Sequence, residues 1–281
     1  MNFTKKQGLG NDFIMIDGFK ETLSPDLMTM TKQLCDRHFG IGADGVIIVL
    51  PSDKADYRMR IINADGSEVE MCGNGIRCFA KYVYEAGLLP QGQDRFTVET
   101  LAGIMTPRIV LQGDNATAVT VDMGEPVLER GDVPMLGPVG QAINEPIAVL
   151  DTTFSLTAVS MGNPHCVIFV DDVEQIDLIK YGPALENHSA FPRKTNVHFV
   201  EVMNRQELRM RVWERGVGIT LACGTGACAV LVAAVLNKKT ERKAKVHLPG
   251  GTLEIEWADN NHIYMTGPAQ SVFTGKVENN A

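Results

Sequence analysis

The sequence predicts an α+β fold of two pseudo-symmetric lobes, in each of which a mixed β-sheet is wrapped around a central helix. Two observations carry this prediction. Short runs typical of strands recur along most of the 281 residues, with no long linker or low-complexity segment between them. A motif of one cysteine and a glycine-rich turn, followed by an apolar helical run, also occurs twice, beginning at Cys72 and again at Cys223.

The repeat extends well beyond the cysteine motif. Residues 59–75 align without a gap with residues 210–226, at an offset of 151. Gly10-Asn11 aligns with Gly162-Asn163 at an offset of 152, and an apolar strand follows each pair. Two landmarks at nearly one offset indicate two homologous lobes. We expect the N-terminal lobe to cover residues 1–123 and the C-terminal lobe residues 124–268.

Local patterns predict the elements of the first lobe. After the turn at residues 8–11, a strand is expected over residues 13–17. A helix follows from Ser24, the expected N-cap, with Pro25 at the first helical position, to about residue 38. Asn63 begins a hairpin-like turn rich in Asn, Asp and Gly. The other strands expected in this lobe cover residues 46–50, 57–62, 96–101, 105–111 and 117–123.

The glycines of residues 40–45 satisfy the pattern GxGxxG. A dinucleotide site needs a strand before the glycines and a helix after them. Here the predicted order is helix, glycines, strand. We therefore interpret this segment as a tight turn and predict no nucleotide site there.

The second lobe is expected to begin with an irregular segment, because residues 131–141 are rich in Gly and Pro. Apart from the second cysteine helix, the pattern predicts only strands. They cover residues 147–150, 154–159, 166–170, 196–202 and 207–213 before the helix, and residues 245–248, 252–257 and 262–266 after it.

Composition and charge exclude several classes of protein. The net charge of −8 disfavours a nucleic acid or an anionic membrane as partner. No stretch approaches the roughly 18 apolar residues that would span a bilayer, and residues 1–7 lack the apolar core of a secretory signal. We therefore expect a cytoplasmic protein whose six cysteines are reduced thiols.

Cys72 and Cys223 each precede a glycine-rich turn at the start of a predicted helix. The unpaired N–H groups and the positive end of the helix dipole favour the thiolate there. We accordingly expect pKa values below the usual value of about 8.5, in the range of roughly 3.5–7.5. An alternative is a set of inert buried thiols, which suits the cysteines in apolar surroundings, namely Cys35, Cys78, Cys166 and Cys228.

Two further interpretations of the cysteines fit less well. The spacings are C-x5-C and C-x4-C, whereas zinc sites use pairs with C-x2–4-C spacing, and the second cysteine of each pair lies inside a predicted helix. A structural disulfide is unusual in the cytosol. The spacing therefore predicts no metal site, and the compartment predicts no structural disulfide.

Catalysis can use one thiol or two. A single nucleophilic cysteine needs a histidine base, for which His165 is the only good candidate, and the second thiol then has no explanation. Two pseudo-symmetric thiols suit the inversion of a carbon that bears a hydrogen, because one proton must leave one face while another reaches the opposite face. If the lobes face each other across a cleft, a thiol stands on each side of that carbon. The N–H groups of the glycine turns would hold a carboxylate and stabilise the developing negative charge.

Residues 63–77 and 213–228 resemble the two active-site motifs of the diaminopimelate epimerase family. Further similarities occur at residues 10–13, 162–165 and 194–197, so that the resemblance spans nearly the whole chain in the expected order. It implies a diaminopimelate epimerase-like fold, in which the C-terminal tail, residues 269–281, returns to the first lobe. It also implies an isomerase that interconverts LL- and meso-2,6-diaminopimelate without pyridoxal phosphate or any other cofactor, for lysine and peptidoglycan biosynthesis, and a homodimer.

The resemblance also assigns roles to residues. It implies that Cys72 and Cys223 form the acid–base pair and that His165 supports the site. The substrate-binding residues that it implies are Asn11, Asn63, Gly73, Asn74, Asn163, Asn196, Glu214, Arg215, Gly224 and Thr225. Their chemistry agrees, because Arg215 can bind a carboxylate in bidentate fashion, Glu214 can pair with an ammonium group, and asparagines both donate and accept.

Two other functions are compatible with part of the pattern. A proline or hydroxyproline racemase of the same fold typically has His in place of Asn74, and Asp-Arg-Ser-Pro in place of Glu214-Arg215-Gly216. A non-catalytic amino-acid binding protein would explain the predicted ligands of the substrate. It would not explain two thiols at helix starts.

Overall fold

A computed structural model describes residues 1–278 of the chain and divides into two compact units. One unit contains Met1–Asp122 together with the C-terminal segment from Thr266, and the other contains Met123–Met265. Strands dominate both units, and four α-helices and a short 3-10 helix occur within residues 1–278. The predicted α+β class is confirmed.

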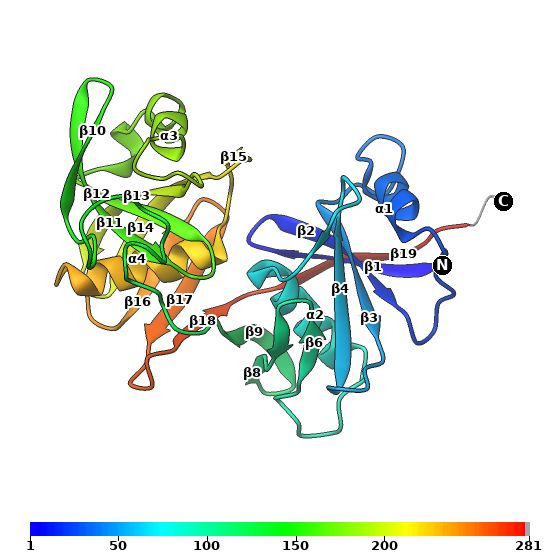
Figure 1. Ribbon diagram of the computed structural model, residues 1–281. Helices are drawn as coiled ribbons and strands as arrows, with labels where there is room; N and C mark the ends of the chain where they lie inside the picture. The colour runs from blue at the N-terminus through cyan, green and yellow to red at the C-terminus, as the bar shows by residue number, and fades with distance from the viewer. Residues whose placement is uncertain (279–281) are drawn as a thin grey trace. The chain divides into compact units, whose positions relative to one another are not determined.

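The first unit is built on a mixed sheet that surrounds helix α2, Gly73–Glu85 (Figure 1). Its strand order is β19-β1-β2-β3-β4-β6-β7, and β5 pairs with β4. The strands are β1 Asn2–Gly8, β2 Asn11–Asp17, β3 Gly45–Leu50, β4 Tyr57–Asn63, β5 Glu68–Val69, β6 Val98–Thr100, β7 Gly103–Met105 and β19 Gln270–Lys276. Helix α1, Leu27–Cys35, connects β2 to β3, and the hairpin of β8, Arg108–Gln112, and β9, Asn115–Asp122, also packs on α2.

The second unit repeats this plan around helix α4, Gly224–Leu236 (Figure 1). Its strand order is β10-β11-β12-β13-β14-β16-β17-β18, and β15 pairs with β14. The strands are β10 Glu145–Val149, β11 Thr152–Ser160, β12 Pro164–Val170, β13 Asn196–Asn204, β14 Glu207–Glu214, β15 Gly218–Ile219, β16 Lys243–Leu248, β17 Gly251–Trp257 and β18 Ile263–Gly267. The 3-10 helix Val173–Gln175 and helix α3, Leu178–Glu186, connect β12 to β13.

The predicted repeat is confirmed by the topology of the two sheets. The first hairpin is antiparallel in both units, β1 with β2 and β11 with β12. The next strand is added in parallel, as β3 beside β2 and β13 beside β12. The fourth is antiparallel again, and it carries the short strand β5 or β15 that leads to the cysteine helix. Two duplicated units with one connection pattern therefore make up the chain.

The two cysteine helices are central because their side chains are covered on most sides. Helix α4 is buried continuously from Gly226 to Ala234, as expected for a helix that is apolar all round. Helix α2 buries Ile76, Phe79 and Val83, at the spacing of one helical face. Each cysteine turn is therefore attached to the core of its own unit.

Helix α1 is shorter than predicted and begins at a different cap. Asp26 is the N-cap and its carboxylate accepts from the Thr29 N–H at 3.0 Å. Ser24 instead accepts from the N–H of Asp26 at 3.2 Å. The helix ends at Cys35, because the Asp36 carboxylate accepts from the N–H groups of His38 and Phe39, each at 2.8 Å, and starts a turn.

Several elements escaped the sequence prediction. Strand β1 contains Lys5 and Lys6, two charged residues whose burial the pattern does not reveal. Lys6 is satisfied by Glu85 and by Ser271 of β19, a strand that was also not predicted. The strand expected over residues 105–111 is two strands, β7 and β8, because Pro107 interrupts the ladder.

Helix α3 was not predicted either, although the repeat contains it. Its bounds, Leu178–Glu186, follow those of α1, Leu27–Cys35, by the same offset of 151 that relates α2 to α4. Gly182 and Pro183 lie inside it and hide its helical pattern. An offset search would therefore have located α3 from the predicted α1.

We predict that Gly182→Ala destabilises the second unit. A Cβ at Gly182 would lie 2.7 Å from Cγ and Cδ2 of Trp213, whose indole N–H donates to Glu186 at 2.7 Å and fixes the ring. Overpacking of this kind costs about 1–3 kcal/mol, which outweighs the gain of up to about 1 kcal/mol from replacing a glycine inside a helix. Urea denaturation followed by circular dichroism measures the net loss.

Gly131→Ala is the matched control for Gly182→Ala. No atom lies within 4 Å of a Cβ built at Gly131, so a change of less than about 0.5 kcal/mol is expected there. Equal stability of the two variants would contradict the packing argument.

Candidate active site

Cys72 is the N-cap of helix α2 in the first unit. Its backbone is extended and its sulfur accepts from the N–H of Gly75 at 3.4 Å, so that the thiol satisfies one of the unpaired donors of the helix start. Gly73, the first residue of the helix, accepts at its carbonyl from Arg77 Nη1 at 3.0 Å. The thiol is half-buried, and its sulfur lies 3.7 Å from Oδ1 of Asn11.

The amide groups of Asn11 and Asn74 are held in fixed orientations beside this thiol. Asn11 Nδ2 donates to Asp44 at 2.7 Å, which turns Oδ1 of Asn11 toward Cys72. The buried Arg77 donates to Oδ1 of Asn74 at 2.8 Å, and Asn74 Nδ2 in turn donates to Asn11 Oδ1 at 3.3 Å. Charged neighbours thus determine which atoms these two amides present.

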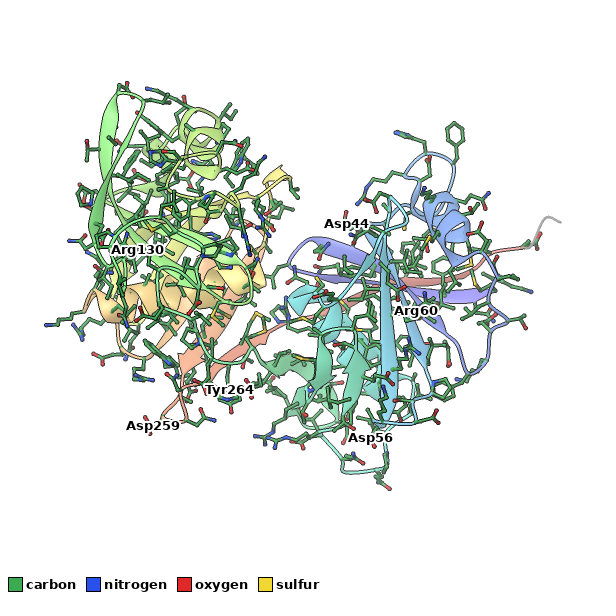
Figure 2. All side chains as sticks on the ribbon, in the orientation of Figure 1. Asp44, Asp56, Arg60, Arg130, Asp259 and Tyr264 are labelled. Atoms are coloured by element: carbon green, nitrogen blue, oxygen red, sulfur yellow. The ribbon has the colours of Figure 1, made fainter. Side chains whose placement is uncertain are left out.

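Asp44 connects this set to the remaining predicted residue of the unit, Asn63. Asp44 lies in the loop immediately before β3 (Figure 2), and its carbonyl accepts from the N–H of Ala64 at 2.9 Å. Asn63 ends β4, and its side chain donates to Ser67 within the same turn at 3.2 Å. The turn that carries Asn63 is therefore attached to the loop that orients Asn11.

Cys223 occupies the equivalent position at the start of α4, but its surroundings differ. Only 6% of the residue is exposed. Its sulfur lies 3.7 Å from the hydroxyl of Thr225, and Gly224 is the first residue of the helix. Glu214 at the end of β14 interacts with the hydroxyl of Thr220 and with the Cys223 thiol.

The low pKa predicted for a thiol at a helix start is wrong for Cys223. Burial raises the pKa of this thiol well above its ordinary value, and the nearby Glu214 carboxylate raises it further. Hydrogen bonds from Thr225 and from the N–H of Gly226 lower the pKa by less. Burial also raises the pKa of Glu214, while its hydrogen bonds to Thr220 and Cys223 act in the opposite direction. Cys223 is accordingly a protonated thiol at neutral pH.

Asn163 and His165 form a polar chain with His198, in which the two histidines are completely buried. His165 Nε2 lies 2.9 Å from Asn163 Oδ1, and its Nδ1 lies 2.8 Å from His198 Nε2. Burial lowers the pKa of His165 well below its ordinary value, with further contributions from His198 and Arg215, and burial lowers the pKa of His198 to about 3. Both imidazoles are therefore neutral, which does not suit His165 as a charged partner of a thiolate.

Asn196 connects this chain to the turn that carries Glu214 and Arg215. Its Nδ2 donates to the carbonyl of Pro164 at 2.9 Å, and its Oδ1 accepts from the N–H of Arg215 at 3.0 Å. Arg215 is exposed, and its Nη1 donates to the carbonyl of Arg193 at 3.1 Å. The buried carboxylate of Glu186 holds the same turn by accepting from Gly216 N–H at 2.9 Å and from the Trp213 indole.

The predicted site residues thus form one connected set in each unit. The first unit brings together Cys72, Gly73, Asn74 and Asn11, with Asn63 in the adjoining turn. The second unit brings together Asn163, His165, Asn196, Glu214, Arg215, Cys223, Gly224 and Thr225. Among residues 1–278, no group of three or more His, Cys, Asp or Glu side chains is arranged to hold a metal ion.

Four residues that orient these sets were not predicted from the sequence, namely Asp44, Glu186, His198 and Thr220. A signal existed for His198, because it lies two residues after Asn196 on a predicted strand and hence on the same face. Asp44 stands within the glycine segment that was interpreted as a turn. Glu186 had no signal, because helix α3 itself was not predicted.

Comparison with known proteins decides the family. The family model described as "Diaminopimelate epimerase" matches residues 3–129 and 157–272. The chain belongs to the diaminopimelate epimerase family. A diaminopimelate epimerase of Pelotomaculum thermopropionicum is 54% identical over 277 residues, 98% of each chain, and that of Desulfitobacterium hafniense is 57% identical over 277 residues, 98% of this chain and 97% of the relative. As a member of this family the chain is an isomerase, which confirms that prediction.

Solved structures confirm the diaminopimelate epimerase-like fold. A phenazine biosynthesis protein of the PhzF family from Bacillus anthracis has a TM-score of 0.71 at 18% identity and covers 99% of each chain. A hydroxyproline epimerase from Agrobacterium vitis has a TM-score of 0.64 at 15% identity over 99% of this chain and 90% of the other. At these identities the likeness concerns the fold alone. In the described part of the chain, no helix has the length and apolar character to span a membrane.

The raised pKa of Cys223 gives a prediction for its reactivity. Alkylation by iodoacetamide should be slow at pH 8 and should still rise with pH above the ordinary thiol pKa of about 8.5, because the thiolate is the reactive form. Glu214→Gln removes the neighbouring negative charge and should accelerate labelling at pH 8 by roughly tenfold for each unit that the pKa falls. Peptide mass spectrometry measures the rate at Cys223 alone.

Glu207→Gln is the matched control for labelling of Cys223. Glu207 begins the same strand β14 that Glu214 ends, about 23 Å away at roughly 3.3 Å per residue. This variant should leave the labelling rate of Cys223 unchanged. Equal acceleration in both variants would mean that local unfolding, and not the Glu214 charge, controls the reaction.

Proposed function

We propose that this isomerase interconverts LL- and meso-2,6-diaminopimelate by a two-base mechanism that uses Cys72 and Cys223. The observation that carries the proposal is the pair of cysteines at equivalent helix starts in two duplicated units of a member of this family. An inversion needs one group to remove the α-proton and a second to return a proton from the other side. A duplicated fold supplies one thiol for each task.

The different surroundings of the two thiols support a division of roles at the start of the reaction. Burial and the Glu214 carboxylate keep Cys223 protonated, so we assign it the role of proton donor. Cys72 is then the base that takes the α-proton as its thiolate, and Gly75 N–H stabilises that form. After one turnover Cys72 holds the proton and Cys223 is the thiolate. The reverse reaction begins from this state.

The helix starts also explain how the carbanion is stabilised. When the α-proton leaves, negative charge spreads onto the carboxylate of the reacting carbon. The first N–H groups of α2 and α4, at Gly73-Asn74 and Gly224-Thr225, are donors without a helical carbonyl partner. We propose that they bind this carboxylate, where a helix dipole and fixed donors favour the charge that develops.

The groups of the second unit fit the remaining polar atoms of the substrate. Glu214 interacts with Cys223, and we propose that its carboxylate pairs with an ammonium group on the reacting carbon. Arg215 is exposed and can bind the distal carboxylate in bidentate fashion, while Asn63, Asn163 and Asn196 complete the pocket. We propose that recognition of two amino-acid ends separates this substrate from proline, which has one.

Three further parts of the proposal are predictions made from the sequence. They are a place in lysine and peptidoglycan biosynthesis, a homodimer and a cytoplasmic location. They stay predictions here.

We predict that heavy water distinguishes two bases from one. When LL-diaminopimelate is converted in heavy water, the meso product should carry deuterium at the inverted carbon, because Cys223 exchanges its proton with solvent before donating. The substrate recovered early should keep its hydrogen, because the proton taken by Cys72 returns to the same face. Mass spectrometry of the separated isomers gives both quantities.

Each alternative predicts a different result in this experiment. Deuterium in recovered LL substrate at the same rate as in product would indicate a single base. Racemisation of proline or 4-hydroxyproline without turnover of diaminopimelate would indicate the racemase alternative. Binding of diaminopimelate without any exchange would indicate a binding protein.

We also predict that the two thiols act as one unit. Cys72→Ala and Cys223→Ala should each lower kcat/KM by at least about 100-fold, the usual contribution of an acid–base group. The double variant should fall little further, because either loss already removes the inversion. Cys78→Ala and Cys228→Ala are matched controls on the same two helices, in the core, and should retain most activity. A variant of Cys72 with normal activity would contradict the mechanism.

A further inference from the structure

His198 has no part in the cysteine motifs or in the proposed mechanism. It belongs to a chain of three polar side chains, with His165 and Asn163, and it packs beside Gly226 at the start of α4. His198 on β13 and His165 on β12 are both completely buried, on two strands that pair in parallel. Their facing nitrogens lie 2.8 Å apart, and the far nitrogen of His165 lies 2.9 Å from Asn163 Oδ1. Within the described residues, Nδ1 of His198 is buried and has no hydrogen-bond partner.

The unpartnered nitrogen determines where the protons of this chain lie. Both rings are neutral because burial lowers their pKa values, so each carries one N–H. A proton on Nδ1 of His198 would be a buried donor without an acceptor, the costlier of the two arrangements. The proton of His198 therefore lies on Nε2 and points at Nδ1 of His165. Nδ1 of His165 must then be the acceptor, and its own proton lies on Nε2.

The direction of the hydrogen bond between His198 and His165 determines how the amide of Asn163 is oriented. Because His165 Nε2 donates, the group of Asn163 that faces it must be the carbonyl oxygen. The NH2 group of Asn163 is then left to face away from the histidines as a donor. If His165 instead donated to His198, its Nε2 would be an acceptor and the NH2 group of Asn163 would face it. Asn163 would then present its carbonyl oxygen to the substrate, and this oxygen repels the carboxylate of an amino acid.

We propose that His198 is a positioning residue, which fixes the tautomer of His165 and thereby makes Asn163 present its NH2 group to the substrate. This inference rests on the proposed function, since it assigns Asn163 to the substrate pocket. Asn11, which aligns with Asn163 in the repeat, is oriented by a carboxylate and not by a histidine, because its NH2 group donates to Asp44. The two equivalent asparagines are therefore held by opposite groups. Asn11 is held by its NH2 group, which donates to Asp44, whereas Asn163 is held by its carbonyl oxygen, which accepts from His165.

His198 also has a packing role that the test must separate from the hydrogen bond. A Cβ on Gly226 would lie 2.4 Å from Cε1 of His198 and 3.0 Å from the sulfur of Cys223, so the ring supports the start of α4. His198→Gln places an amide N–H near the position of Nε2 and keeps the donor. His198→Met has a similar volume and no donor. His247→Met, on strand β16 of the same unit, is a control for the loss of one imidazole.

Nitrogen NMR of protein labelled with 15N-histidine tests the tautomers directly, with His165→Gln used to assign the signals. Wild type and His198→Gln should show His165 protonated on Nε2, whereas His198→Met should show a mixture of both tautomers. In steady-state assays with diaminopimelate, His198→Met should raise KM roughly tenfold, the usual effect of losing one hydrogen bond to a charged group, with a smaller change in kcat. His198→Gln and His247→Met should stay within about twofold of wild type.

Each result bears on the inference in a definite way. Wild-type His165 protonated on Nδ1, or equal tautomers and equal KM in His198→Gln and His198→Met, would overturn it. If His198→Met does not fold, the tautomers of wild type and His198→Gln still decide the direction of the chain. Failure of wild type to convert diaminopimelate would overturn the proposed function, while the NMR result on the histidines would stand.

Discussion

The arrangement of this protein depends on how the unpaired N–H groups at the start of a buried helix find hydrogen-bond partners. Helices α2 and α4 are each surrounded by strands of their own unit, and the first N–H groups of each are donors without a helical partner, as at every helix start. At α2 the sulfur of Cys72 accepts from one of these donors, the N–H of Gly75. At α4 a Cβ on Gly226 would collide with the His198 ring, so the glycine lets this side chain pack directly against the helix start. A thiol beside free backbone donors is the consequence in both units.

Duplication produced two such starts, and divergence around them gave the thiols different properties. The first unit surrounds Cys72 with amides that Asp44 and Arg77 hold in place, and the thiol is half-buried. The second unit buries Cys223 beside Glu214, and the His198 ring packs against Gly226 at the same helix start. In the proposed mechanism this difference decides which thiol holds the proton before the reaction starts, because two identical thiols would have no preferred distribution of one proton.

Much of this could be predicted from the sequence because the relevant signals are local or repeated. The glycine-rich turns after Cys72 and Cys223 predict two helix starts, and the offset of 151 relates their units. Strands with alternating or apolar patterns, such as β3 and β14, follow from periodicity. The prediction missed elements whose pattern is disguised, such as β1 with its buried Lys5 and Lys6, and α3 with Gly182 and Pro183 inside it.

The sequence by itself determined the α+β class, the duplication and the family. Only the tertiary structure decided the protonation of Cys223, the orientation of the asparagine amides, and the parts played by Asp44, Glu186 and His198. The physical reason is that a helix start favours thiolate through groups within one turn of the chain, whereas burial depends on strands far away in sequence that cover it. At Cys223 the cost of burying a charge is larger than the effect of the helix start, and no local pattern contains that comparison.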